Sequence, residues 1–394
     1  MGRSIIITLS SPSRKNKLLD LFILILVLAL VLAACQPASV NSPSQTWTVT
    51  PLPTRTTTIT PTHTPTITFT PSPSPSSSPT TTATSTLTPT LAPLGIFSAK
   101  TLRPGIAPQT YLADQCAYLK MRWSPGGSPP GTVVVPIMFH SIVQDGREVA
   151  DPARDISVTQ FNDFVQYARY LGFKTITTQE LFDFLTKNTP IPQYSMMIIV
   201  DDRRPGLIRD RLMPVLEENN WTATAAYIAA PDDLPWAWVL MEQLYATGRL
   251  DVQSHGYTGA VYIYPDTPLD KIQDEIWSST AVLEQHFGQR PIAFIWPGGD
   301  FTQLSVQVAR EGGYQLGFTA YSRGPLMFNW IPLGEAERAI NDPLMLLPRV
   351  WSSAANVNLD EAIKLSGQAA TFAEQNFLVE ASWYRTYCGG EISR

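Results

Sequence analysis

Two adjacent carboxylates, Asp201 and Asp202, follow directly on an apolar run at 196–200. Five apolar residues in a row predict a strand that is buried on both faces, as in parallel sheets and barrels. A carboxylate at the end of such a strand is rarely buried without water, a cation or a ligand. The pair therefore marks a candidate site, although an acidic pair that only caps the next helix is the alternative.

Polar or turn-forming residues also follow other predicted strands. After the strands 132–139, 250–254 and 292–296 come His140, His255 and Pro297-Gly298-Gly299, respectively. In a parallel barrel the carboxyl ends of all strands open on one face, where sites are built. We therefore expect these residues to lie with the acidic pair, while either histidine could instead be a hydrogen-bonded structural residue.

The elements that must position these residues alternate between strand and helix. Helical patterns are expected at 159–171, 177–185, 207–219, 236–247, 269–287 and 303–311, with further strands at 222–228, 316–320 and 346–350. This alternation predicts a parallel sheet and an α/β domain. About seven such units suit a closed or nearly closed barrel.

These residue types favour hydrolysis of an amide or ester. A carboxylate and an imidazole can hold a divalent ion, which lowers the pKa of bound water and polarises a carbonyl. A second carboxylate can then act as general base. In this interpretation Asp201 is the base, Asp202 and His255 bind the metal, and the backbone N–H of Gly298 approaches the oxyanion.

The region 132–352 resembles the NodB homology domain of polysaccharide deacetylases, carbohydrate esterase family four. The matching segments stand in the family's order: Ile137-Met138-Phe139-His140-Ser141, Ile199-Val200-Asp201-Asp202, Gln253-Ser254-His255, Ala293-Phe294-Ile295-Trp296-Pro297-Gly298-Gly299 and Leu347-Pro348-Arg349-Val350. The resemblance implies a deformed (β/α)7 barrel and metal-dependent removal of acetyl groups from a glycan. It also assigns the catalytic base to Asp201, a metal ligand to Asp202 and the first metal-binding histidine to His255.

Three positions depart from the family pattern. Gly259 stands where the second metal-binding histidine is expected, and Arg203 replaces the glycine after the acidic pair. The last histidine of the sequence, His286, lies within a predicted helix, so the family's C-terminal general acid has no counterpart. Arg203 could pair with Asp202 and take the place of the cation.

Other residues are candidates for completing the site. His140, Tyr257 or Asp266 could supply the third ligand for a divalent metal, for which Zn²⁺ is our first choice. Trp296 and Pro297 border the glycine turn. Sugar rings could stack on the indole rings, although as a set they are more typical of a core: Trp236, Trp238, Trp296, Trp330 and Trp351.

The first 35 residues resemble a bacterial lipoprotein signal. A basic start and an apolar run end at Leu32-Ala33-Ala34-Cys35, which predicts cleavage before Cys35 and its lipidation. A simple transmembrane anchor is the alternative. Residues 36–98 are dominated by Thr, Pro and Ser and predict a disordered, extended tether. Both alternatives place the remaining chain outside the cytoplasm.

The rest of the chain divides into an N-terminal extension (99–131), the deacetylase-like domain and a helical extension (353–394). Cys116 and Cys388 stand near the two ends of this part and predict a disulfide in an oxidising compartment, with two free thiols as the alternative. The net charge of −5 argues against a nucleic-acid partner.

The sequence thus favours a lipid-anchored enzyme that hydrolyses carbon–nitrogen bonds of N-acetylated envelope glycans. Two alternatives remain. One is a catalytically inactive barrel that binds glycan through aromatic residues, and the other is a glycoside hydrolase on a similar barrel. A polysaccharide partner and a membrane contact through the N-terminal lipid belong to the first interpretation.

Overall fold

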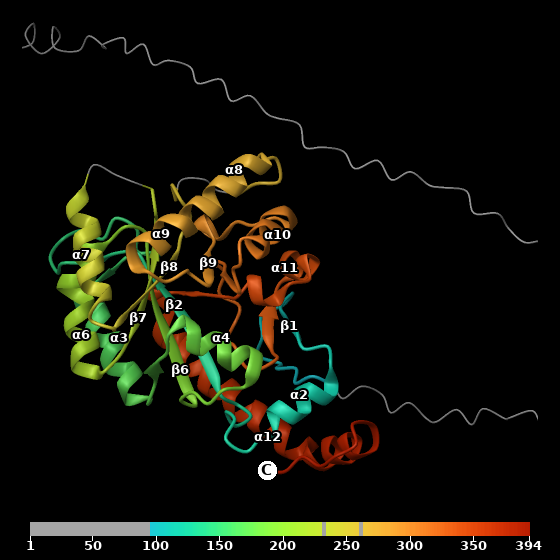
Figure 1. Cartoon of the computed structure of the whole chain (residues 1–394). Helices are drawn as coiled ribbons and strands as arrows, with labels where there is room; N and C mark the ends of the chain where they lie inside the picture. The colour runs from blue at the N-terminus through green and yellow to red at the C-terminus, as the bar shows by residue number, and fades with distance from the viewer. Residues whose placement is uncertain (1–94, 231–233, 260–262) are drawn as a thin grey trace, which may run out of the picture. The chain divides into compact units, whose positions relative to one another are not determined.

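In this computed structural model, the described residues are 95–230, 234–259 and 263–394 (Figure 1). The predicted signal peptide, the lipidation site Cys35 and most of the Thr/Pro/Ser-rich tether lie outside them. Within the described part, no helix is long and apolar enough to cross a membrane.

Seven parallel strands of the described chain form the centre of the molecule, in the order β10-β9-β8-β7-β6-β2-β12. They are β2 (Val133–Phe139), β6 (Tyr194–Asp201), β7 (Ala223–Tyr227), β8 (Leu250–Ser254), β9 (Ala293–Ile295), β10 (Leu316–Phe318) and β12 (Val350–Trp351). A β-bridge between Phe318 of β10 and Leu347, just before β12, connects the first and last strands of this order. The predicted (β/α)7 barrel is confirmed. Its deformation shows between β8 and β9, which pair only through Ser254 and Phe294.

The strands are buried on both faces, as their apolar runs predict. Every residue of β2 is buried. In β6, Ile198 and Val200 belong to one apolar cluster, whereas Met197 and Ile199 belong to another. Because successive side chains point to opposite faces of a strand, this alternation means that no face of β6 is left to solvent.

Helices cover the outside of the sheet. They are α3 (Val158–Tyr170), α4 (Thr178–Lys187), α5 (Pro205–Leu207), α6 (Met213–Asn219), α7 (Pro235–Tyr245), α8 (Leu269–Gln273), α9 (Ser279–Phe287), α10 (Gln303–Glu311) and α11 (Glu335–Ile340). Single π-helical turns, Ile208–Leu212 and Asp274–Ser278, join α5 to α6 and α8 to α9. Thr177 and Glu180 form a capping box at the start of α4. The start predicted at Thr159 is wrong, because Ser157 caps α3 with Gln160 as its partner.

Short strands other than these seven were not predicted. β1 (Ala107–Gln109) pairs with β11 (Ile331–Leu333), β3 (Ile142–Val143) pairs with β4 (Ile156–Ser157), and β5 (Lys174–Thr175) pairs with the start of β6. Runs of two or three residues are too short to show a periodicity of their own.

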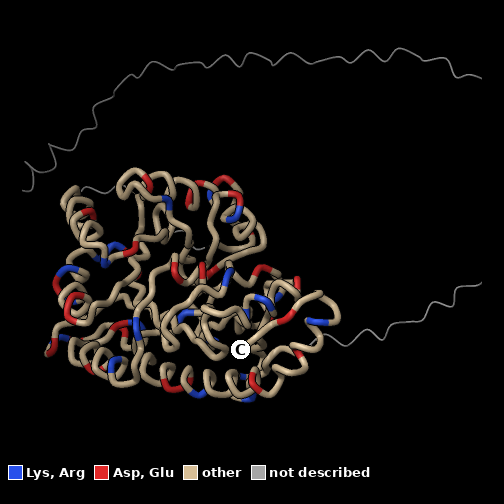
Figure 2. The backbone as a smooth tube through the Cα atoms, turned by 60° about the horizontal axis from the view of Figure 1, so that its bottom comes forward, with Lys and Arg blue, Asp and Glu red and all other residues tan. Residues whose placement is uncertain are grey.

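The C-terminal extension first packs on the barrel beside β2 and α3, and its later part packs against the N-terminal extension (Figure 1). The predicted C-terminal helix is α12 (Ala355–Tyr387), and the N-terminal extension contains α2 (Gln115–Arg122). A disulfide joins Cys116 to Cys388, with their Cα atoms 5.6 Å apart, so this pairing is confirmed. Acidic and basic residues are interspersed over the described part of the chain (Figure 2).

Candidate functional site

Asp201 ends β6 at the mouth of the barrel with only 2% of its surface exposed. Nη1 of Arg349 donates to its Oδ1 at 2.5 Å, and Nε of Arg349 donates to the carbonyl of Thr319 at 2.9 Å. Burial alone raises the pKa of the Asp201 carboxyl. The positive charge of Arg349, which is the largest opposing influence, outweighs burial, and the pKa lies below its ordinary value. Asp201 is therefore held as a carboxylate.

Two imidazoles face this carboxylate. Oδ2 of Asp201 lies 3.7 Å from Nε2 of His140 and 4.0 Å from Nε2 of His255. Nδ1 of His255 lies 2.8 Å from the carbonyl oxygen of Ile295, which can only accept, so Nδ1 carries the hydrogen. In the neutral ring Nε2 then keeps its lone pair toward the carboxylates, which is the orientation of a metal ligand.

His140 is the less constrained of the two rings. It stacks against Trp351 with ring centroids 5.5 Å apart, and its Nδ1 is buried without a hydrogen-bond partner among the described residues. Burial lowers the pKa of His140, and the negative charges of Asp201 and Asp202 only partly offset this effect. The neutral ring is favoured, and Nε2 again points toward Asp201.

Asp202 adopts a left-handed backbone conformation with φ of 68°, which is uncommon outside glycine. Its Oδ1 lies 3.8 Å from Nε2 of His255. Its Oδ2 pairs with Nη2 of Arg204 at 3.1 Å, and the same guanidinium donates to the hydroxyl of Ser141 at 3.2 Å. One oxygen of Asp202 thus faces the imidazole while the other is taken by an arginine.

Arg204, and not the predicted Arg203, pairs with Asp202. Arg203 donates to the carbonyls of Ile228 and Ala230, and its guanidinium lies over the ring of Tyr227. The left-handed turn at Asp202 sends the next two side chains in different directions, so Arg204 makes the predicted pairing. The prediction that Arg203 itself occupies the cation's place is wrong.

Two described donors fit a divalent ion. Nε2 of His255 and Oδ1 of Asp202 are 3.8 Å apart. Zn²⁺ binds nitrogen and oxygen at about 2.1 Å, so a single ion between these two atoms can bind both. Within the described ranges, no set of three or more His, Cys, Asp or Glu side chains is arranged to hold a metal. Asp266 is exposed, and Tyr257 packs against an apolar cluster. A third ligand therefore stays a prediction.

The conformation of the loop after β8 favours glycine at position 259, where the family pattern has a histidine. Gly259 has φ of 65°, and a Cβ built on it would lie 2.4 Å from Cδ1 of Ile228. The buried carboxylate of Glu275 accepts from the backbone N–H groups of Thr258 and Gly259 and from the hydroxyl of Thr258. Ile228 and Glu275 together fix this loop in a shape that leaves no room for a side chain.

The glycine turn follows β9 on the same rim. Pro297 and Gly299 are buried, whereas Gly298 is exposed with φ of 66°. A Cβ on Gly299 would lie 2.6 Å from the backbone nitrogen of Ala320, so this turn requires glycine there. The exposed Gly298 is the position at which a substrate oxygen can approach the backbone.

Trp296 is fully buried, and its Nε1 donates to the carbonyl of Met345 at 2.9 Å, so it presents no face to a sugar. Sequence reasoning missed the roles of Arg204, Glu275 and Arg349. A signal existed for Arg349, because an arginine within an apolar closing strand must be paired if it is buried.

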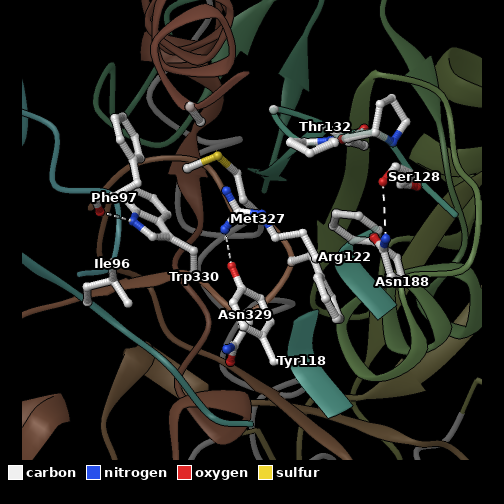
Figure 3. Close-up of a pocket in the computed structure, with 16 residues that line it drawn as sticks. Ile96, Phe97, Tyr118, Arg122, Ser128, Thr132, Asn188, Met327, Asn329 and Trp330 are labelled. Atoms are coloured by element: carbon white, nitrogen blue, oxygen red, sulfur yellow. Dashed lines mark hydrogen bonds between the residues drawn. The ribbon is translucent and has the colours of Figure 1, made fainter. Parts of the chain in front are cut away.

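A second hollow lies at the opposite end of the barrel, near the starts of β2 and β6 (Figure 3). Nε1 of Trp330 donates to the carbonyl of Phe97 at 2.7 Å, and Nδ2 of Asn188 donates to the carbonyl of Ser128 at 3.1 Å. These polar groups hold neighbouring segments of the protein together. The hollow is therefore part of the packing between the barrel and its extensions.

Residues 189–317 match the polysaccharide deacetylase family model. The comparison with curated proteins gives no match. Among solved structures, Streptococcus pyogenes deacetylase PplD in complex with acetate is 20% identical, with 59% of this chain and 99% of that chain covered and a TM-score of 0.49. IcaB from Ammonifex degensii is 21% identical, with 61% and 98% covered and a TM-score of 0.46. The putative polysaccharide deacetylase BA0330 from Bacillus anthracis is 18% identical, with 59% and 69% covered and a TM-score of 0.46.

Over residues 189–317, which contain the acidic pair, His255 and the glycine turn, this chain is polysaccharide deacetylase-like, as its motifs predict.

Proposed function

We propose that this protein is a hydrolase that removes acetyl groups from N-acetylated amino sugars of an envelope polysaccharide. The observation that carries the proposal is the convergence of Asp201, Asp202, His140 and His255, whose facing atoms lie 3.7 to 4.0 Å apart at one end of the barrel. These residues come from three separate strands, and the family similarity covers the region that contains most of them.

In the proposed reaction, Asp201 accepts a proton from a water molecule while the water oxygen attacks the acetyl carbon. The Arg349 pairing keeps Asp201 ionised and its carboxylate fixed. The N–H of Gly298 donates to the developing oxyanion. The carbon–nitrogen bond then breaks, the departing amine takes back the proton that Asp201 accepted, and acetate is released.

A divalent ion, Zn²⁺ in this proposal, supplies Lewis acidity toward the carbonyl and lowers the pKa of water. Asp202 and His255 would hold it, with His255 oriented by the carbonyl of Ile295. Because Oδ2 of Asp202 already pairs with Arg204 and the described residues offer two donors, binding should be weak compared with a site that has three protein ligands.

A catalytically inactive glycan-binding protein is the second candidate. Two observations favour it, namely the loop that excludes a side chain at Gly259 and the arginine that pairs with Asp202. In such a protein the barrel mouth would hold an acetylated sugar without cleaving it.

The two candidates differ in acetate release. Purified protein should release acetate from N-acetylchitotetraose when Zn²⁺ is added, and a chelator should abolish the release. Asp201→Asn should abolish it, whereas Asp210→Asn, at an exposed position on the following segment, should not. Substrate binding without acetate release supports the inactive binder, and release of reducing ends instead of acetate supports a glycoside hydrolase.

We further propose that the domain acts outside the cytoplasm, anchored by lipid on Cys35. Residues 36–98 would then separate it from the membrane surface, since about 60 extended residues at roughly 3.1 Å each reach up to about 190 Å. The C35A variant should lose lipid labelling and leave the membrane fraction. Membrane retention of that variant would favour an uncleaved transmembrane anchor.

A further inference from the structure

A large aromatic side chain is exposed at the start of α7. Trp236 has 54% of its surface exposed, although most of the other tryptophans proposed for sugar stacking are buried or nearly so. Its neighbour Leu234 is 47% exposed. Single exposed apolar residues are ordinary, so Trp236 matters only because of what lies beside it.

Trp236 lines an open groove on the surface. The other lining residues are Arg203, Pro205, Ile228, Leu234, Ala237 and Thr258. The wall opposite α7 is fixed, because Arg203 donates to the carbonyls of Ile228 and Ala230. Thr258 is held by the carboxylate of Glu275. These contacts fix the side of the groove that Arg203 and Thr258 form.

The groove opens beside the candidate active site. Its residues follow β6, β7 and β8, and β7 lies between the other two in the sheet. β6 delivers Asp201 and Asp202, and β8 delivers His255. Arg203 directly follows Asp202, and Thr258 lies three residues after His255. Because these lining residues stand next to candidate site residues, the groove adjoins the candidate site.

We propose that the Trp236 groove is a glycan subsite that binds the sugar unit next to the one being deacetylated. The C–H face of a pyranose ring is apolar and packs against an indole, while its hydroxyls remain at the ring edge. This inference takes its ligand class from the proposed function, because the occupant is a neighbouring unit of the same polysaccharide. It adds that oligomers bind more tightly than the monomer and that Trp236 accounts for the difference.

The test measures binding and acetate release separately. Wild type, Trp236→Ala, Trp236→Phe and Val239→Ala are titrated with N-acetylchitotetraose and with N-acetylglucosamine. Val239 is the matched control, since it lies on the same helix with 52% of its surface exposed but does not line the groove. Trp236→Ala should weaken tetramer binding about tenfold, the equivalent of removing one aromatic contact. Trp236→Phe should recover most of the affinity, and monomer binding should stay unchanged.

Two outcomes would overturn the subsite, namely equal tetramer affinity in Trp236→Ala and wild type, or no tetramer binding by the wild type. These results are independent of catalysis. If wild type releases no acetate but Trp236→Ala loses tetramer affinity, the subsite stands and the hydrolase proposal fails. If acetate is released with the same KM by both proteins, the hydrolase stands and the subsite fails.

Discussion

Arg349 sets the charge of Asp201, since each is almost completely buried and their closest atoms are 2.5 Å apart. Removing one member of a buried ion pair leaves the other charge without compensation. The same pairing fixes the carboxylate oxygen that is not facing the imidazoles. Stability and the proposed general base thus depend on one contact between β6 and the segment before β12.

Replacing Arg349 with Met should lower the free energy of unfolding by about 3–5 kcal/mol, because Asp201 would be buried without its partner. Chemical denaturation measures the change. The double variant Asp201→Asn/Arg349→Met should recover part of the loss, since no buried charge remains. An equal loss in the single and double variants would mean that packing, not charge, holds Arg349.

Arg204 and Arg203 form a natural pair of variants for the proposed metal site. Arg204→Ala frees Oδ2 of Asp202 and removes a positive charge 3.1 Å from it, so Zn²⁺ affinity should rise several-fold. Arg203→Ala removes an arginine that does not contact Asp202 and should leave the affinity unchanged. Calorimetric titration with Zn²⁺ distinguishes the two, and a greater effect of Arg203→Ala would contradict the assignment.

At the scale of elements, the loop after β8 is held by the π-helical turn between α8 and α9. Glu275 lies in that turn and accepts hydrogen bonds from Thr258 and Gly259. Because the loop begins at His255, its anchoring also restrains the imidazole. π-Helical turns often occur at functional positions. Here the turn places the carboxylate of Glu275 within hydrogen-bond distance of the loop that begins at His255.

Glu275→Gln should destabilise the protein by about 1–3 kcal/mol, because the amide NH₂ would face backbone N–H donors in a buried place. Zn²⁺ affinity should fall with it. Glu284→Gln, at an exposed position of α9, serves as the control in thermal denaturation. If Glu275→Gln lowers the Tm but leaves Zn²⁺ affinity unchanged, the loop does not position His255.

The contact between α2 and α12 carries a buried acid. Nε1 of Trp123, which follows α2, donates to Glu380 at 2.6 Å, and Arg122 lies 3.6 Å from its other oxygen. Burial raises the pKa of Glu380 despite both partners. The native protein therefore binds more protons than the unfolded chain between the ordinary value of about 4.3 and the raised native value.

From this difference, the contribution of Glu380 to stability is greatest below its ordinary pKa and is lost as the pH rises through the native value. Glu380→Gln keeps the acceptor for Trp123 and should flatten this part of the profile of unfolding free energy against pH. Denaturation curves at several pH values provide the measurement. An unchanged slope would show that Glu380 does not titrate in this window.

Over the whole described molecule, the disulfide joins the N-terminal extension to the end of α12. Cys116 and Cys388 are 272 residues apart in sequence, so the bond closes a loop that spans the entire barrel. Closing a long loop restricts the unfolded chain more than the folded one. Because the disulfide joins α2 to the end of α12, away from the barrel mouth, the bond should matter for stability and not for chemistry.

Replacing both cysteines with Ser should lower the free energy of unfolding by about 2–5 kcal/mol. The proposed acetate release, measured well below the Tm, should be retained. Loss of activity in a folded double variant would show that the extensions influence the barrel mouth. Mass spectrometry of the untreated protein, before and after reduction, confirms that the bond is present.

The sequence by itself determined the barrel and the end of it that carries the site. Strands that are buried on both faces appear in the sequence as continuous apolar runs. In a parallel barrel, the residues that follow the strands all lie at the same end of the barrel. That is why Asp201, Asp202, His140 and His255 could be placed together without any knowledge of packing. The cysteine pair followed from its position near the two ends of the domain.

Tertiary structure decided the details of charge and access. Adjacent residues such as Arg203 and Arg204 look equivalent in sequence, and only the turn at Asp202 separates their directions. Whether Trp236 or Trp296 is exposed, and whether Ile228 leaves room at Gly259, depends on segments far apart in the chain. These outcomes arise from close packing between elements, which no local pattern encodes.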